Sequence, residues 1–325
     1  MLSGYLISGS VFRMIERGTW RWATYLIHRL TRLWVVLLPG LLLCALWDSI
    51  GLHFHIAPAL YGGAGYNHMT PNVARVLTVK TFAENMLFLQ GITAPTFGSD
   101  GALWSLANEF WYYILFPLGL LAVYRSAKRT AAAPERVLYA ALFLTTAWLL
   151  PVAFLNGFAI WLAGMLLCLV PRLKVGHIAR VLCAPAYILV FLALIKVRAL
   201  PGFAVDDILA LATFLMLWVV VSATEPARRS PGERLSHELA RFSYTLYVAH
   251  TPLLVLLAAL AVGDGRWTPT PSHVLEALCI LAAVLLYAYG VAFLTEFNTD
   301  VWRRRLEAAL GLDASRETSS AVRRS

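Results

Sequence analysis

The sequence predicts an all-α protein, a polytopic bundle of transmembrane helices, and three observations point to that class. Of the 325 residues, 59% are apolar and 14% are charged, whereas a soluble domain carries about 25% charged residues. Apolar segments of membrane-crossing length recur along the chain. The 11 Trp and 13 Tyr residues supply the amphipathic rings that are typical of membrane interfaces. We therefore expect about eight full crossings, preceded by a short N-terminal helix.

The expected helices follow the apolar segments in chain order. Residues 1–12 are apolar but end at a basic stretch that starts at Arg13, so they fall short of the roughly 20 apolar residues of a crossing. We expect the eight crossings at about residues 33–47, 103–124, 137–150, 152–170, 180–197, 207–223, 241–262 and 274–296.

The stretch 137–170 is assigned two of these crossings for a physical reason. As one continuous helix it would be about 50 Å long, against a hydrocarbon core of about 30 Å. Pro151 and Gly157 interrupt it, and both residue types punctuate helices. Two short crossings that meet near Pro151 therefore fit the bilayer better.

The basic residues lie mainly on alternate connections between these segments. Of the 27 Lys and Arg residues, 22 lie at 13–32, 125–136, 172–180 and 228–241 and in the tail from Arg303. Basic connections remain in the cytoplasm, so this side of the protein, with the C-terminus, is predicted to be cytoplasmic. Topology thus accounts for the net charge of +9, and we expect no nucleic-acid partner.

The cysteine and histidine residues give no metal site. The four cysteines lie inside apolar segments without C-x2-C spacing, which is typical of buried free thiols. His53 and His55 lie in a long outer connection, residues 48–102, without a clear carboxylate or Cys partner. We therefore expect neither a metal nor a bound cofactor.

A first polar stripe lies in LWSLANEFWYYILFP, residues 103–117. Ser105, Glu109 and Tyr112 or Tyr113 follow one helical face. A carboxylate two turns into a crossing needs a partner or takes up a proton, and ionisable residues in crossings are functional candidates. Glu109 is either such a functional group or a structural one that hydrogen-bonds between helices.

A second polar stripe lies in RFSYTLYVAHTPLL, residues 241–254. Ser243, Tyr247 and His250 share a face of an otherwise apolar helix, and Pro252 follows. His250 is either a general base or proton-relay group, or a histidine satisfied within the helix bundle.

A third candidate is the cytoplasmic stretch RWATYLIHRLTRLW, residues 21–34. Arg29 and Arg32 lie on one helical face with Arg21 and Tyr25, and such a face can bind the phosphates of an acyl-CoA or of lipid headgroups. The alternative is membrane anchoring by basic and Trp residues.

Four of these stretches, in this order, resemble the acyltransferase-3 family of integral membrane O-acyltransferases. They are SGYLI at 3–7, HRLTRLWVVLLP at 28–39, LWSLANEFWYYILFP at 103–117 and FSYTLYVAHTP at 242–252. The resemblance implies transfer of an acyl group, with acetyl expected, from acyl-CoA to a hydroxyl of a cell-surface or exported saccharide or similar acceptor. It also implies an integral protein of the bacterial inner membrane, in contact with its lipids.

The resemblance carries over to individual residues. It implies catalytic roles for Ser105, Glu109 and His250, and substrate-binding roles for Arg29, Arg32, Trp104, Tyr113, Tyr244 and Tyr247. The implied acyltransferase-like domain covers residues 1–300. Residues 301–325 form a basic cytoplasmic tail, of which the polar stretch 312–325 is expected to be disordered.

Family members carry an earlier helix with a basic residue and, after ten others, a histidine that is taken to handle the acyl group. None of this precedes Met1. We expect that the start has been assigned too late, the alternative being a truncated gene and an inactive remnant. A different class, a proton-coupled transporter or flippase that uses Glu109 and His250 as a relay, also stays open, although the sequence shows no inverted repeat.

Overall fold

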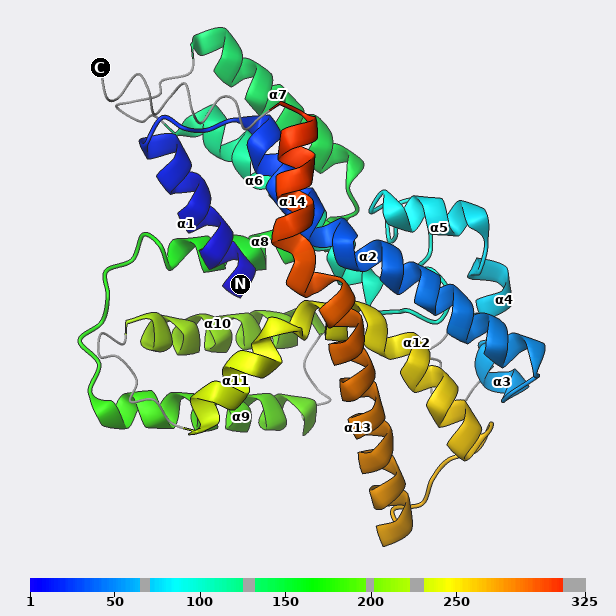
Figure 1. Cartoon of the computed structure of the whole chain (residues 1–325). Helices are drawn as coiled ribbons and strands as arrows, with labels where there is room; N and C mark the ends of the chain where they lie inside the picture. Colours follow the sequence, from blue (N-terminus) through cyan, green and yellow to red (C-terminus); the bar gives the residue numbers. More distant parts are fainter. Residues whose placement is uncertain (65–70, 125–131, 197–201, 223–230, 312–325) are drawn as a thin grey trace. The chain divides into compact units, whose positions relative to one another are not determined.

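The computed structural model describes residues 1–64, 71–124, 132–196, 202–222 and 231–311 (Figure 1). These residues form helices joined by turns and loops, with no named strand among them, which confirms the predicted all-α class. The chain divides into two compact units. Unit 1 is Met1–Trp20 with Tyr112–Arg228, and unit 2 is Arg21–Trp111 with Arg229–Ser325.

Unit 1 contains the N-terminal helix and the middle of the chain. Its helices are α1 (Leu2–Glu16), the second half of α6 (Leu103–Val123), α7 (Ala133–Leu149), α8 (Val152–Leu166), α9 (His177–Lys196) and α10 (Gly202–Val221). Helix α1 packs against α8 through two glycines. A Cβ on Gly4 would lie 2.1 Å from the carbonyl oxygen of Trp161, and one on Gly164 would lie 1.9 Å from that of Met1. The missing side chains therefore allow backbone-to-backbone contact.

The predicted division of residues 137–170 into two helices is confirmed. Helix α7 ends at Leu149, and Leu150 and Pro151 are extended, with ψ values of 143° and 149°. Helix α8 starts at Val152. The two helices have 17 and 15 residues, because the extended backbone and Pro151 end one helix before the next begins.

Unit 2 contains the rest of the fold. Its elements are α2 (Trp22–His53), α3 (Pro58–Tyr61), α4 (Val73–Val76), α5 (Val79–Met86), the first half of α6, α11 (Pro231–Arg241), α12 (Ser243–Val262), α13 (Pro271–Leu294), the 3-10 turn η1 (Glu296–Asn298) and α14 (Thr299–Ala309). Helix α12 packs against both α2 and α13, and α14 packs against α2. Gly40 lies at the α2–α12 contact, where an added Cβ would come 2.6 Å from Cγ1 of Val248.

The segment that was predicted to be a tail begins with an ordered helix. Residues 301–309 belong to α14, and Glu307, which is 4% exposed, lies 2.5 Å from Nε2 of His28 on α2. The stretch 312–325, for which disorder was predicted, lies outside the described residues, as do several predicted cytoplasmic basic residues, among them Arg125, Lys128, Arg129, Arg228 and Arg229.

Helices occur at all eight predicted crossings. Among the described residues, the helical segments long and apolar enough to span a membrane are Trp22–His53, Leu103–Val123, Ile178–Ile195, Ser243–Val262 and Pro271–Ala309. Helix α8 is apolar but shorter. A polytopic helical membrane protein is therefore confirmed, and the count of eight crossings stays a prediction.

Candidate functional site

Unit 2 contains all but one of the predicted site residues. The exception is Tyr113, which lies in unit 1 and is 3% exposed. The residues in unit 2 come from three helices: Arg29 and Arg32 on α2, Trp104, Ser105 and Glu109 on α6, and Tyr244, Tyr247 and His250 on α12. Trp104, at the start of α6, is 58% exposed, whereas the polar residues of α6 and α12 meet in a network.

The hydroxyl of Tyr247 links α12 to the start of α6. Its oxygen lies 2.7 Å from the carbonyl oxygen of Ala102 and within hydrogen-bonding distance of Oγ of Ser105. A carbonyl only accepts, so Tyr247 donates its one proton to Ala102. Ser105 therefore donates its proton to the hydroxyl oxygen of Tyr247.

The tautomer of His250 follows from its neighbours. Its Nδ1 lies 2.9 Å from the carbonyl oxygen of Leu246 and 3.0 Å from that of Tyr247. Because both partners only accept, Nδ1 carries the proton of the neutral imidazole, and Nε2 carries the lone pair. Nε2 lies 3.3 Å from Oγ of Thr251. The backbone of α12 thus presents Nε2 as the basic nitrogen.

Tyr244 connects α12 with α2 and lies near Glu109 of α6. Its hydroxyl donates to the carbonyl of Leu33 on α2, at 3.2 Å. The same hydroxyl interacts electrostatically with Glu109 and Arg32. Glu109 also lies within electrostatic range of Tyr247. The carboxylate therefore belongs to the same polar region as the α12 stripe.

The two arginines of α2 have different surroundings. The guanidinium of Arg29 lies 5.5 Å from the ring centroid of the buried Tyr25, in a cation–π contact. Arg32 is exposed and interacts electrostatically with the Tyr244 hydroxyl. Arg32 is thus the more accessible of the pair for an anionic substrate.

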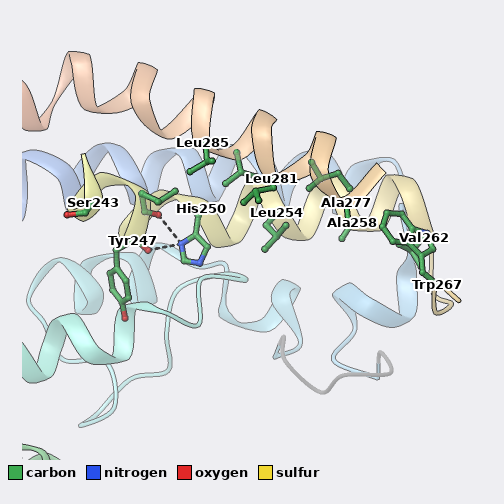
Figure 2. Close-up of a pocket in the computed structure, with 13 residues that line it drawn as sticks. Ser243, Tyr247, His250, Leu254, Ala258, Val262, Trp267, Ala277, Leu281 and Leu285 are labelled. Carbon is green, nitrogen blue, oxygen red and sulfur yellow. Dashed lines mark hydrogen bonds between the residues drawn. The ribbon is translucent and has the colours of Figure 1, made fainter. Parts of the chain in front are cut away.

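A cavity of about 560 Å³ runs between α12 and α13 and starts at this network. Figure 2 shows Ser243, Tyr247 and His250 at one end and Trp267 at the other. The wall between them is apolar, with Leu254 and Ala258 on α12 and Leu281 on α13. The cavity volume is that of a small-molecule site, and its polar groups gather where Nε2 of His250 lies.

Comparison with known proteins shows the family of this chain. A family model described as an acyltransferase domain matches residues 1–296. The chain belongs to the acyltransferase-3 family. This acyltransferase-3 match covers unit 1, the part of unit 2 that ends at Glu296, and every predicted site residue, and it makes the chain a membrane acyltransferase in general. No curated protein and no solved structure matches the chain.

The candidate site has a buried neighbour that the sequence interpretation missed. Asp48, fully buried near the end of α2, accepts hydrogen bonds from the backbone N–H and the hydroxyl of Ser99, both at 2.7 Å. The thiol of Cys44 adds a weaker contact at 3.4 Å. Gly98 makes this approach possible, since its φ is 57° and a Cβ there would lie 2.2 Å from Oδ2 of Asp48.

Asp100, the next residue after Ser99, is 1% exposed. The hydroxyl of Thr251 and the N–H of Ala102 approach its carboxyl, but neither carboxyl oxygen has a hydrogen bond of ordinary geometry. Burial raises the pKa of Asp100 well above its usual range, and the nearby Asp48 carboxylate raises it further. Burial thus favours the neutral form of this carboxyl, which lies beside the α12 network.

These acids were missed because the first predicted crossing ended at residue 47. Asp48 therefore fell into the outer connection, and the stretch FGSDGALW around Asp100 has no periodicity. Asp48 directly follows an apolar segment with helical character, and an acidic residue at such a position is a signal that could have identified it. Among the described residues, no group of three or more His, Cys, Asp or Glu side chains could hold a metal.

Proposed function

We propose that this acyltransferase moves an acyl group, acetyl in the simplest case, from acyl-CoA to a hydroxyl of a saccharide or similar acceptor at the bacterial inner membrane, with its C-terminus in the cytoplasm. Family membership supports the reaction class. The observation that carries the proposal is the basic Nε2 of His250 at the polar end of the α12–α13 cavity.

In the proposed reaction, Nε2 of His250 accepts the proton of the acceptor hydroxyl as its oxygen attacks the thioester carbonyl. A carbon–oxygen bond forms, the carbon–sulfur bond breaks, and the proton passes from His250 to the departing CoA thiolate. A base is required because a neutral alcohol is a weak nucleophile. The hydrogen bonds from Nδ1–H to the carbonyl oxygens of Leu246 and Tyr247 hold the imidazole in the tautomer that this step needs.

The other predicted residues take supporting roles in this proposal. Ser105 and Tyr247 fix α12 against the start of α6, and Glu109, which interacts electrostatically with Tyr244 and Tyr247, orients the catalytic group or the acceptor. Arg29 and Arg32 bind the phosphates of the acyl-CoA, because guanidinium groups match phosphate geometry.

The test compares two histidine variants of unit 2 in isolated bacterial inner membranes that contain the full chain. His250→Gln removes the proposed base. His273→Gln is the matched control, because Nδ1 of His273 also lies near a carbonyl, that of Thr268 at 2.7 Å, but its ring stacks on Trp267 at the far end of the cavity. The substrate is acetyl-CoA with a labelled acetyl group, and the readouts are thiol release and label in the saccharide fraction.

We expect His250→Gln to lower the rate of both readouts by about 10²- to 10⁴-fold, the range that general bases contribute, and His273→Gln to leave it unchanged. Equal rates in the two variants would show that His250 is not the base. Labelled acetyl-CoA that is consumed by neither the wild type nor the control would contradict acyl transfer by this chain.

A further inference from the structure

A second cavity, of about 470 Å³, lies wholly within unit 1, and nothing in the proposed reaction uses it. Its walls come from α1, from the end of α6, from the residues that follow α8 and from the end of α10. Unlike the apolar α12–α13 cavity, it combines charged and apolar groups. Arg13, Glu16 and Arg172 line it together with the aromatic rings of Phe12 and Trp218.

Arg13 is placed over the cavity by a glycine one turn earlier on α1. A Cβ added to Gly9 would lie 3.5 Å from Nη1 of Arg13 and 3.6 Å from Sγ of Cys168. Gly9 therefore leaves a space between the guanidinium and the thiol, and Arg13 folds back along α1 toward it. The thiol in turn donates to the carbonyl of Tyr5 at 3.3 Å, which ties the end of α8 to α1.

Arg172 is held beside α10 by its two chain neighbours. The carbonyl of Pro171 accepts a hydrogen bond from the indole N–H of Trp218 at 3.1 Å. The N–H of Leu173 donates to the hydroxyl of Ser222 at 2.9 Å. Two hydrogen bonds to α10 that flank residue 172 fix the backbone from which its guanidinium extends, although this segment has no regular secondary structure of its own.

The one acid among the lining residues is engaged inside unit 1. The hydroxyl of Tyr124 donates to Oε1 of Glu16 at 3.4 Å, and the Tyr124 ring meets the edge of Phe12 at 5.7 Å. The lining residues therefore include two guanidinium groups against one carboxylate, with an apolar wall of Leu6, Leu169 and Val221.

We propose that this cavity binds the phosphate group of an amphipathic molecule between Arg13 and Arg172, and that an anionic phospholipid is its main source. Guanidinium groups bind phosphate oxygens by paired, charge-assisted hydrogen bonds. Basic pockets between transmembrane helices on the cytoplasmic side bind anionic headgroups, and Arg13 and Arg172 belong to two predicted cytoplasmic basic clusters. The apolar wall accommodates the chain that carries the phosphate.

The cavity shares no residue with the proposed acyl-CoA site, because Arg29 and Arg32, the residues assigned to acyl-CoA, lie in unit 2. The test therefore needs no activity. The full chain is reconstituted in nanodiscs of phosphatidylcholine alone or mixed with phosphatidylglycerol, and native mass spectrometry counts the phosphatidylglycerol that it retains. A second arm titrates CoA into protein in phosphatidylcholine nanodiscs and measures binding by calorimetry.

Two sets of variants distinguish binding at this site from a general effect of positive charge. Arg13→Gln and Arg172→Gln are each compared with Arg17→Gln, which removes an exposed positive charge just after α1 that does not line the cavity. Gly9→Leu fills the space under Arg13, whereas Gly9→Ala places its Cβ at ordinary contact distances.

We expect Arg13→Gln, Arg172→Gln and Gly9→Leu each to lower phosphatidylglycerol retention about tenfold, the effect of losing one charge-assisted contact, while Arg17→Gln and Gly9→Ala behave like the wild type. The same pattern in the CoA arm alone would support the phosphate site and make the nucleotide its source. Retention and CoA binding that fall no further in the cavity variants than in Arg17→Gln would overturn the proposal.

Discussion

At the residue scale, the hydroxyl of Tyr247 determines what its neighbours can do. Because its proton goes to the carbonyl of Ala102, the hydroxyl of Ser105 is committed to Tyr247. In the proposed reaction, Ser105 therefore acts through the position of α12 relative to the start of α6. This role differs from nucleophilic catalysis, in which the serine proton would pass to a base.

We predict that Tyr247→Phe lowers the free energy of unfolding by about 0.5–1.5 kcal/mol, because it removes the hydroxyl that the Ala102 carbonyl and the Ser105 hydroxyl share. Ser105→Ala removes one of the two bonds and costs less. Thermal unfolding of the protein in nanodiscs measures both. Tyr289→Phe on α13 is the control, since this ring is 44% exposed and packs on Phe242. A Tyr247→Phe variant as stable as Tyr289→Phe would contradict the hydrogen-bond assignment.

Asp100 gives a pH-dependent prediction. Burial raises the pKa of Asp100 above its value in the unfolded chain, so the folded state binds this proton more tightly. The stabilisation is complete below the unfolded pKa, about 3.9, and is lost as the pH rises through the raised, folded-state pKa. Asp100→Asn, which does not titrate, should therefore gain stability relative to the wild type as the pH rises.

Denaturation midpoints measured between acidic and mildly alkaline pH test this difference. Asp300→Asn, which changes a carboxylate that is 68% exposed, controls for the loss of a charge. A stability difference between Asp100→Asn and wild type that stays constant, or that falls with pH, would show that Asp100 is not held as a neutral acid.

Sequence periodicity predicted part of this residue-scale arrangement. It placed Ser243, Tyr247 and His250 on one face, because i, i+4 and i+7 positions align on any helix. It did not reveal which group each side chain contacts across helices, since this depends on how α6 and α12 pack. The tautomer of His250 follows from two carbonyls of its own helix. These contacts depend on the side-chain rotamer, which no sequence pattern predicts.

At the element scale, hydropathy located the helices well but not their ends. Helix α2 spans Trp22–His53, although only 33–47 was predicted as a crossing, because its first turns carry Arg29 and Arg32 and are not apolar. Hydropathy measures burial in lipid, whereas a helix continues into water as long as its hydrogen bonds and contacts persist. The predicted outer connection 48–102 likewise contains three short helices, of which α5 is capped by the side chain of Thr78.

The α2–α12 contact yields a prediction about packing. A Cβ on Gly40 would lie 2.6 Å from Cγ1 of Val248, so Gly40→Ala forces the two helices apart and should cost about 1–3 kcal/mol of stability. Gly290→Ala on α13 is the matched control, because no heavy atom lies within 4 Å of its added Cβ, and alanine favours the helix. Thermal unfolding measures both variants.

Adding Val248→Ala to Gly40→Ala removes the clashing methyl and should restore part of the lost stability, the mark of a direct contact in a double-mutant cycle. Additive losses in the double variant would mean that Gly40 and Val248 do not meet as described.

At the scale of the whole molecule, composition and motif order predicted the class and the family, both of which are confirmed. They could not predict that the chain divides into two units, each of which is assembled from two separated stretches. Composition is nearly uniform along the apolar segments, so it carries no signal about which helices associate. That information resides in small contact residues such as Gly4, Gly40 and Gly164, whose partners only the fold reveals.

The discontinuity of unit 2 has a consequence for biosynthesis. Its first stretch, Arg21–Trp111, leaves the ribosome before all but the first twenty residues of unit 1, and its second stretch starts at Arg229. The Asp48–Ser99 contact lies within the first stretch and can form early, whereas Tyr247 reaches Ser105 only when α12 has been made. A nascent chain halted after α10 would thus contain both partners of the Asp48–Ser99 contact but lack His250, so the proposed base is added late in synthesis.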